Sequence, residues 1–334
     1  MKFLITGGAG FIGSHLATYL VGKNNEVAIL DNFSTGKREN IRGLPVELIK
    51  GDIRNIECLD EAVAGVDTVF HQAALCSVVR SVNDPLSTHE VNATGTLKVL
   101  EACRRAGVRR VVFASSSSVY GDAESLPKLE QMPAAPLSPY AVSKLIGEHY
   151  CQLYWKAFGL ETVALRYFNV FGPRQDPDSE YAAVIPKFMQ ALVNGEPLEV
   201  FGDGSQTRDF TYVENVVLAN VAAAMSARAA GKVMNIACGS RWSLLDLLAR
   251  LNKLFDTDVS PILREWRKGD VRHSQASIDL AQKLIGFWPQ VGFEQGLNKT
   301  VGWYLSSRRP EREVVTRVLS DTRESVPLQA GSRQ

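Results

Sequence analysis

Tyr140 and Lys144 lie four residues apart in the stretch SPYAVSKLIGEHY at 138–150. A helix places such positions on one face, so a phenol and an ammonium group would be neighbours. A free tyrosine has a pKa near ~10 and is a poor base at neutral pH. A nearby positive charge lowers that pKa, so the pair could remove a proton from a hydroxyl group. A surface contact between the two side chains is the plainer alternative.

Glycines recur in the segment TGGAGFIG at 6–13, where Gly7, Gly10 and Gly13 have the spacing GxxGxxG. Glycines let the backbone turn tightly and approach a pyrophosphate, whose charge is bound by N–H groups at a helix N-terminus. The order of strand, glycine loop, helix and second strand therefore predicts a dinucleotide site.

Asp31 ends the second predicted strand. A carboxylate there accepts hydrogen bonds from both ribose hydroxyls and repels a 2′-phosphate, which favours NAD over NADP. The alternative is that Asp31 and Asn32 only begin a turn. Asp52 in GDI at 51–53 follows the third predicted strand and could meet the adenine amino group, although a surface turn would look the same. With NAD⁺ beside it, Tyr140 would take the hydroxyl proton as hydride leaves the adjacent carbon.

Four serines follow another predicted strand in FASSSSVYG at 113–121. In open α/β folds, ligands bind at the carboxyl edge of the sheet, where this strand would end. Serine hydroxyls there could hydrogen-bond a substrate oxygen as it becomes a carbonyl. A serine cluster is ordinarily only a loop, but this one accompanies both the glycine loop and the Tyr–Lys pair.

The elements that position these groups alternate between strand and helix. Apolar, β-branched runs predict strands at 2–6, 26–30, 46–50, 67–72 and 110–115, with helices at 11–23 and 85–107. This alternation predicts a doubly wound parallel sheet with helices on both faces, a Rossmann-type α/β fold. We expect the NAD-binding domain to span 1–168, with later returns of the chain.

The second half is less regular and predicts a smaller α/β lobe over 169–305. Its expected helices lie at 184–194, 213–227 and 243–255, and its expected strands at 162–173, 198–201, 233–237 and 258–266. The tail at 306–334 is rich in arginine, serine and glutamate, and it predicts a flexible end.

Composition excludes several classes of protein. Across 334 residues, 37 Lys plus Arg balance 36 Asp plus Glu, so no net charge favours nucleic acid or membrane as a partner. Five widely spaced cysteines without a CxxC motif predict reduced thiols in a cytoplasmic protein. No metal site is expected, because the five histidines have no ligand spacing. The sequence also contains no signal-peptide core or spanning apolar run.

Taken together, these motifs resemble the extended short-chain dehydrogenase/reductase family, in particular its nucleotide-sugar epimerases. The resemblance runs from Met1 to about Tyr304 and rests on nine segments in the family's order. They are TGGAGFIGSHL, DNFSTG, GDI, HQAA, VNATGTLKVLEA, SSSSVYG, YAVSK, RYFNVFGP and RDFTYVENV.

The resemblance implies a catalytic set of Tyr140, Lys144 and Ser116, with NAD as cofactor. Lys144 would also hold the nicotinamide ribose. The expected cofactor contacts are Gly7, Gly10, Phe11, Ile12, Gly13, Asp31, Asn32, Ser34, Gly36, Asp52, Ile53, Gln72, Ala73, Ala74, Asn92, Tyr140, Lys144 and Tyr167.

A UDP-hexose substrate is implied in the same way. Its expected contacts are Ser77, Val78, Ser116, Ser117, Ser118, Tyr140, Asn169, Ala183, Val184, Lys187, Arg208, Arg267, Asp270 and Ser274. Arginine suits the diphosphate because its planar fork pairs with phosphate oxygens. Each arginine could instead be a solvated surface group, and Arg267 is the least secure of them.

The residues beside the serines select among the family's reactions. Dehydratases of this family carry an Asp–Glu pair there, and UDP-glucuronate decarboxylases carry a glutamate. Here Ser117 and Ser118 occupy those places and cannot act as acid and base near pH 7. The expectation is therefore reversible 4-epimerisation through a 4-keto sugar. A decarboxylase or another C4-oxidising relative is the alternative, and a non-catalytic NAD-binding scaffold is the rival from outside the enzymes.

Substrate choice depends on Ser274, where epimerases restricted to glucose and galactose carry a tyrosine. A serine leaves room for an N-acetyl group, which predicts UDP-GlcNAc and UDP-GalNAc as preferred substrates and UDP-Glc and UDP-Gal as weaker ones. The resemblance also implies a homodimer, formed by the helices at 86–106 and 138–158.

Overall fold

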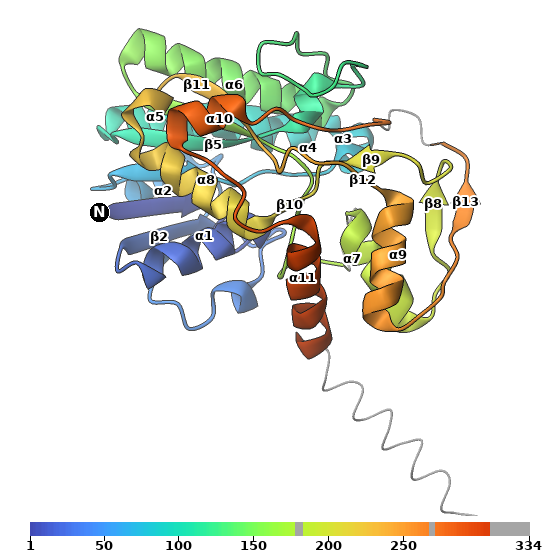
Figure 1. The fold of residues 1–334 in the computed structure, drawn as a ribbon. Coiled ribbons are helices and arrows are strands. Elements are labelled where there is room, and N and C mark those ends of the chain that lie inside the picture. The colour runs from blue at the N-terminus through green and yellow to red at the C-terminus, as the bar shows by residue number, and fades with distance from the viewer. Residues whose placement is uncertain (178–182, 267–270, 308–334) are drawn as a thin grey trace, which may run out of the picture.

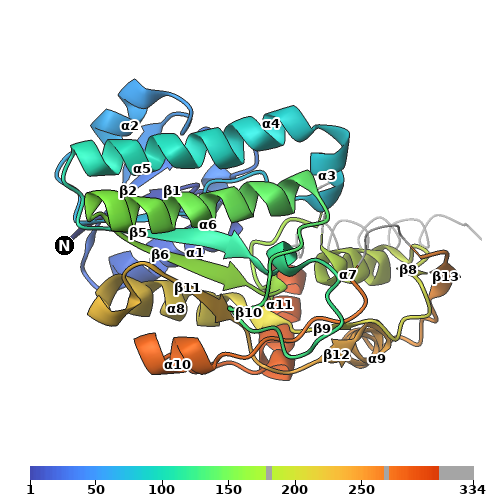
Figure 2. The same ribbon diagram turned by 90° about the horizontal axis from the view of Figure 1, so that it is seen from above.

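A seven-stranded parallel sheet forms the centre of the protein (Figures 1 and 2). This computed structural model describes residues 1–177, 183–266 and 271–307. The strand order is β11-β6-β5-β4-β1-β2-β3. The strands are β1 (Lys2–Thr6), β2 (Glu26–Asp31), β3 (Glu47–Lys50), β4 (Thr68–His71), β5 (Arg110–Ser116), β6 (Glu161–Tyr167) and β11 (Lys232–Ile236). The predicted Rossmann-type fold class is confirmed.

Helices cover both faces of this sheet, because successive strand side chains alternate between two apolar cores. In β1, Ile5 packs into one core and Leu4 into the other. The Ile5 side is covered by α1 (Phe11–Gly22), α8 (Val213–Met225) and α10 (Asp279–Ile285). The Leu4 side is covered by α2 (Ile56–Ala62), α5 (Gly95–Arg105) and α6 (Pro139–Phe158).

Helix α6 begins where the sequence predicts, and its start fixes the position of Tyr140. The hydroxyl oxygen of Ser138 accepts a hydrogen bond from the N–H of Ala141 at 3.2 Å, and Pro139 occupies the first helical position. Both features favour a helix start at this residue. The helix ends at Gly159, whose φ of 73° is left-handed.

The predicted helix at 85–107 is interrupted in the structure. It consists of α4 (Pro85–His89), the π-helical turn η2 (Glu90–Thr94) and α5. A short helix that the sequence analysis did not predict, α3 (Val78–Asn83), precedes it. The hydroxyl oxygen of Ser77 accepts a hydrogen bond from the N–H of Arg80 and so caps α3.

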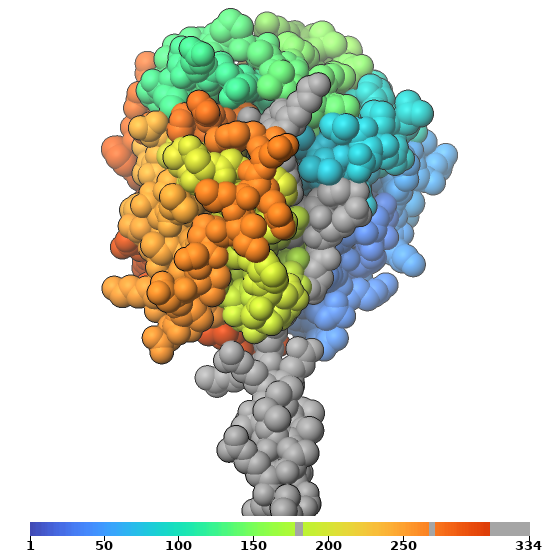
Figure 3. Space-filling model, turned by 90° about the vertical axis from the view of Figure 1, so that its right-hand side faces the viewer, coloured from blue at the N-terminus to red at the C-terminus, as the bar shows by residue number. Residues whose placement is uncertain are grey.

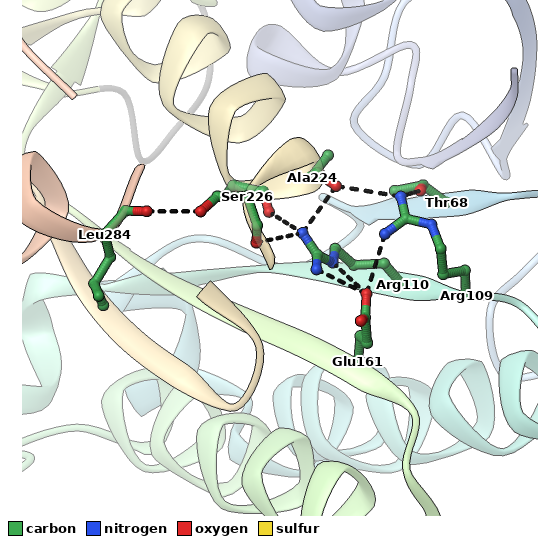
Figure 4. A network of polar contacts seen from close by, with 8 residues as sticks. Thr68, Arg109, Arg110, Glu161, Ala224, Ser226 and Leu284 are labelled. Atoms are coloured by element: carbon green, nitrogen blue, oxygen red, sulfur yellow. Dashed lines mark hydrogen bonds and ion pairs between the residues drawn. The ribbon is translucent and has the colours of Figure 1, made fainter. Parts of the chain in front are cut away.

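Two later segments return to the sheet. Strand β11 pairs with β6, and α8 packs against α1. Arg110, which is 1% exposed, holds the end of α8 (Figure 4). One of its terminal nitrogens donates to the carbonyl oxygens of Ala223, Ala224 and Ser226 at 2.8–2.9 Å, and Glu161 neutralises the guanidinium at 2.7 Å. These are carbonyls that a helix end leaves without intrahelical partners.

The second unit has its own core and three small sheets. Its elements are β7 (Val170–Phe171), α7 (Val184–Asn194), β8 (Glu199–Phe201), β9 (Thr207–Arg208), β10 (Thr211–Tyr212), β12 (Trp242–Ser243), α9 (Leu244–Phe255), β13 (Ile262–Arg264) and α11 (Phe293–Ser307). Stacked aromatic rings of Phe210, Trp242 and Phe293 lie at its centre. The strand predicted over 258–266 is shorter than expected, because only β13 pairs, with β8.

Within the described residues, the remaining elements are the short 3₁₀ turns η1 (Arg38–Ile41), η3 (Ser117–Tyr120) and η4 (Ala227–Ala229). Ser306 and Ser307 belong to α11, and the rest of the predicted flexible tail lies outside the described residues. Arg267 and Asp270 also lie outside them. In the described part of the chain, none of the helices has the length and apolar character needed to cross a membrane.

Candidate active site

Two adjoining cavities lie between the carboxyl edge of the large sheet and the second unit. The first has a volume of about 720 Å³ and is lined by the glycine loop, the ends of β2, β4 and β5, and the start of α6. The second has a volume of about 890 Å³ and lies against α7, β8 and the start of α3. Both are lined by Ser77, Val78, Asn169, Ala183 and Arg208, so they form one continuous cleft. Figure 3 views the molecule from this side. The cyan segment with α3 and α4 lies on the right, and the yellow-green to orange second unit lies on the left.

The glycine loop leaves no room for side chains. A Cβ on Gly13 would lie 2.3 Å from the carbonyl oxygen of Gly7, and one on Gly7 would lie 2.7 Å from the Cα of Ala73. Gly7 also has a left-handed φ of 70°. No side chain caps α1, so its first turn presents backbone N–H groups without intrahelical partners toward the cavity. The loop thus has the close backbone approach and the unpaired N–H groups that the predicted dinucleotide site requires.

Asp31 is held rigidly at the end of β2. Its carboxylate accepts hydrogen bonds from the N–H of Ala9 at 2.9 Å and of Phe33 at 2.8 Å. A Cβ on Gly36 would lie 2.9 Å from both carboxylate oxygens, so the chain at Gly36 passes close by. The side chain lines the first cavity. A fixed carboxylate beside an anion cradle fits the ribose of NAD.

Asp52 also lines the first cavity, but its oxygens are already engaged. Arg54 forms an ion pair with it at 2.8 Å, and the side-chain amide of Asn32 donates to it at 2.9 Å. The hydrogen bonds from Arg54 hold the pKa of Asp52 well below its usual range. A direct bond to the adenine amino group therefore competes with these contacts.

Tyr140, Lys144 and Ser116 all line the first cavity. The ammonium nitrogen of Lys144 lies 5.9 Å from the centre of the Tyr140 ring and donates a hydrogen bond to the carbonyl oxygen of Ala114 at 2.8 Å. Ser116 lies beside the phenol of Tyr140 and favours its ionised form. Three side chains from β5 and the first two turns of α6 thus surround one position in the cavity.

Burial shifts the pKa values of both titratable groups in this set. It raises the pKa of Tyr140 above its usual value, and the neighbouring Ser116 opposes this only in part. Burial lowers the pKa of Lys144. Desolvation therefore opposes the phenolate, and the expected lowering of its pKa depends on the positive charges of Lys144 and NAD⁺ together.

Asn92 does not line either cavity, which corrects its expected role beside the cofactor. Its side chain is 1% exposed and fully used elsewhere. The amide oxygen accepts from the N–H of Leu75 at 2.8 Å, and the amide nitrogen donates to the carbonyl oxygen of Leu75 and the hydroxyl of Ser143, both at 3.1 Å. The π-helical turn η2 presents this side chain, so Asn92 positions the cleft-lining segment around Leu75.

The other expected contacts meet in the cleft. The first cavity is lined by the remaining expected cofactor residues and by Ser77, Val78, Ser117, Ser118, Asn169, Ala183, Arg208 and Ser274. Val184 and Lys187 line the second cavity. The side-chain amide of Asn169 contacts the hydroxyl of Ser274 at 3.4 Å, and Arg208 donates to the carbonyl oxygen of Arg272 at 3.2 Å.

Several cleft residues were not predicted from the sequence. Cys76, Lys128, Arg174 and His273 all line the first cavity. Cys76 adjoins Ser77 and could have been found from its neighbour. Lys128 gives no such signal, because it reaches the cavity through an isolated bridge to Ala276, far along the chain. Among the described residues, no group of three or more His, Cys, Asp or Glu side chains could hold a metal ion.

Comparisons with known proteins agree with this geometry. The model of the NAD dependent epimerase/dehydratase family matches residues 3–237. UDP-glucose 4-epimerase of Mycolicibacterium smegmatis is 38% identical over 315 residues, which are 91% of this chain and 98% of that protein.

Two further relatives differ in substrate. UDP-N-acetylglucosamine 4-epimerase of Methanobrevibacter ruminantium, solved with UDP-N-acetylmuramic acid, is 40% identical with a TM-score of 0.88, covering 92% of this chain and 98% of that one. UDP-N-acetyl-alpha-D-glucosaminuronate decarboxylase of Bacillus cytotoxicus is 35% identical and covers 91% of this chain and 97% of that protein.

Proposed function

This chain belongs to the NAD dependent epimerase/dehydratase family, and from that premise we propose that it interconverts UDP-hexoses that are epimeric at C4. The observation that carries this is the meeting of Tyr140, Lys144 and Ser116 in one cavity with the glycine cradle and Asp31. The acetylated pair, UDP-GlcNAc and UDP-GalNAc, is the preferred substrate pair, and UDP-Glc and UDP-Gal are weaker ones.

The residues supply the proton chemistry. Tyr140 removes the proton of the sugar 4-hydroxyl, while Ser116 donates a hydrogen bond to the same oxygen as it becomes a carbonyl. Lys144 contributes positive charge beside the phenolate and holds the nicotinamide ribose. When bound, NAD⁺ would supply the acceptor for the hydride that leaves C4 of the sugar. In its reduced form it would supply the hydride that returns to the opposite face of the 4-keto sugar. The glycine cradle and Asp31 hold the cofactor throughout.

The lining of the cavity supports epimerisation over elimination or decarboxylation. Ser117 and Ser118 follow Ser116, and neither can serve as an acid or a base near neutral pH. The nearby Glu148 is 2% exposed and forms an ion pair with Arg166 at 2.7 Å behind the cavity wall. Among the described residues of the first cavity, the carboxylates are Asp31, Asp52 and Asp176, and the first two lie at the ribose side.

Preference for the acetylated pair rests on Ser274. This small side chain lines the first cavity beside Asn169 and is 8% exposed. A larger residue would fill the space next to the hexose. We assign cofactor binding to residues 1–168 with the returning segments, and UDP-sugar binding mainly to 169–305, including Arg267 and Asp270. A cytoplasmic location belongs to the same proposal.

Product analysis by mass tests the reaction. The purified protein, supplied with UDP-GlcNAc, is expected to yield an isomer of unchanged mass, with a slower reaction on UDP-Glc. Release of water would indicate a dehydratase. Release of carbon dioxide from a UDP-hexuronate, without isomerisation of UDP-GlcNAc, would indicate a decarboxylase. No turnover of any UDP-hexose by protein that retains NAD would favour a scaffold.

A homodimer is part of the proposal. Apolar side chains on the outer side of α3, α4 and α6 are exposed, among them Val82, Leu86, Val142 and Leu153, with Leu86 at 79%. Pairing of α5 and α6 with their copies would cover part of this face. Sedimentation should give twice the monomer mass, and Leu86→Glu together with Leu153→Glu should give monomers. A monomeric wild-type protein at micromolar concentration would contradict it.

A further inference from the structure

Ser118 makes two contacts with the hydroxyl oxygen of Ser116. The N–H of Ser118 lies 3.2 Å from the hydroxyl oxygen of Ser116, and the hydroxyl oxygen of Ser118 lies 2.9 Å from it. We propose that Ser118 is a positioning residue that occupies the acceptor side of the Ser116 hydroxyl and so turns its one proton into the cavity, where Tyr140 lies. This inference rests on the proposed function and adds a role that pocket lining alone does not give Ser118.

The direction of these bonds follows from the capacity of a hydroxyl group. Ser116 has one proton and two acceptor lone pairs. The N–H of Ser118 can only donate, so it fills one lone pair. When the hydroxyl of Ser118 donates as well, the second lone pair is filled, and the proton of Ser116 is left for the cavity that Ser116 and Tyr140 both line. The resulting order is Ser118 to Ser116 to Tyr140.

The backbone makes this arrangement rigid. Ser116 ends β5 and caps the 3₁₀ turn η3, whose tight course brings Ser118 back over Ser116. Val119 and Tyr120, the next two residues, are 0% and 1% exposed. The hydroxyl of Tyr120 donates to the side-chain oxygen of Asn235 at 2.7 Å, which ties the turn to β11. Ser118 is therefore fixed by buried neighbours on the chain.

A chain of hydrogen bonds ending at a charged group is cooperative, since each donor strengthens the next. Ionised Tyr140 accepts from Ser116, and the bond from Ser118 makes Ser116 a better donor. Loss of the Ser118 hydroxyl should therefore make ionisation of Tyr140 harder. Burial already opposes that ionisation, so the effect falls on the group that removes the substrate proton.

The test compares Ser118→Ala and Ser118→Thr in the NAD-loaded protein. The ionisation of Tyr140 is followed by tyrosinate absorbance as the pH is raised. The absorbance of the same protein carrying Tyr140→Phe is subtracted, so that only the signal of Tyr140 remains. Ser118→Ala is expected to move this titration upward by about half a pH unit. The acidic limb of kcat for UDP-GlcNAc should move by the same amount, with KM changed less than twofold. Ser118→Thr keeps the hydroxyl and should restore both.

Ser306→Ala provides a matched control, because this serine lies on α11 and lines neither cavity. An unchanged Tyr140 titration in Ser118→Ala would overturn the proposal, as would a rise in KM without a shift of the acidic limb. The absorbance measurement needs no sugar. A shifted titration in a protein that turns over no UDP-hexose would therefore uphold the role of Ser118 and reject the proposed function.

Discussion

The carboxylate of Asp209 accepts a hydrogen bond from the N–H of Ala276 at 3.2 Å, two residues beyond Ser274. The same carboxylate accepts from the N–H groups of Cys238 at 3.0 Å and Gly239 at 3.1 Å. Asp209 is fully buried, and its own carbonyl oxygen accepts from the side chain of Asn169 at 3.3 Å. One residue thereby joins the cleft-lining segments of Asn169 and Ser274 to the chain at 238–239.

Asp209→Asn should weaken substrate binding more than it slows the reaction. The new amide group places N–H donors against backbone N–H groups, so the segment with Ser274 shifts. We expect KM for UDP-GlcNAc to rise about tenfold, equivalent to ~1.4 kcal/mol, with kcat within about threefold and NAD content unchanged. Asp203→Asn, at an exposed turn of the same unit, should behave as wild type. Equal KM values in both variants would contradict the role of Asp209.

Tyr140→Phe should lower kcat by about 10²–10⁴-fold, because the phenol that removes the hydroxyl proton is lost. The variant should retain NAD, since the glycine cradle and Asp31 are untouched. Initial rates with UDP-GlcNAc and the cofactor content of the purified protein measure both effects. Turnover at the wild-type rate would remove the basis of the mechanism.

Ser274→Tyr should separate the two substrate pairs. The tyrosine ring would occupy the space proposed for the N-acetyl group, so turnover of UDP-GlcNAc should fall by more than about 100-fold. Turnover of UDP-Glc should stay within about threefold. Ser274→Ala, which keeps the space, is the control and should turn over both pairs. Undiminished turnover of UDP-GlcNAc by the tyrosine variant would refute the assignment.

His15 should make the protein less stable in acid. Burial lowers the pKa of His15 from 6.5 to about 4, and its ring hydrogen-bonds the carbonyl oxygen of Pro173 at 2.8 Å. The unfolded chain thus binds a proton at a higher pH than the folded protein does. The contribution is complete above pH 6.5 and declines as pH falls toward 4. His15→Gln should reduce the slope of the unfolding free energy against pH between 6.5 and 4. Urea titrations at several pH values measure this slope. His149→Gln, which replaces an exposed histidine, is the control; an equal slope in both variants would contradict this.

Arg110→Met should cost about 1–3 kcal/mol of unfolding free energy. The substitution removes the buried partner of Glu161 and leaves the carbonyl oxygen of Ala223 without this donor, whereas Arg109 still contacts Glu161 and the carbonyl oxygen of Ala224. Denaturant unfolding measures the loss. Arg105→Met, which removes an exposed pair with Asp60, should cost less than about 1 kcal/mol. Similar losses in the two variants would show that the Arg110 network does not hold α8.

Features that depend on local spacing could be predicted from the sequence. Strand alternation predicted the sheet, the glycine spacing predicted the cradle at α1, and four-residue spacing put Tyr140 and Lys144 on one face of α6. These patterns are readable because backbone geometry repeats every two or every 3.6 residues.

Tertiary structure decided what depends on contacts between distant segments. It turned Asn92 away from the cleft and onto Leu75, brought Lys128 beside Ala276, and placed Asp209 under the segment that carries Ser274. It also set the pKa of Tyr140, since burial is a property of the packed molecule. Such contacts join residues up to 148 positions apart, as Lys128 and Ala276 are, and no local periodicity in the chain encodes them.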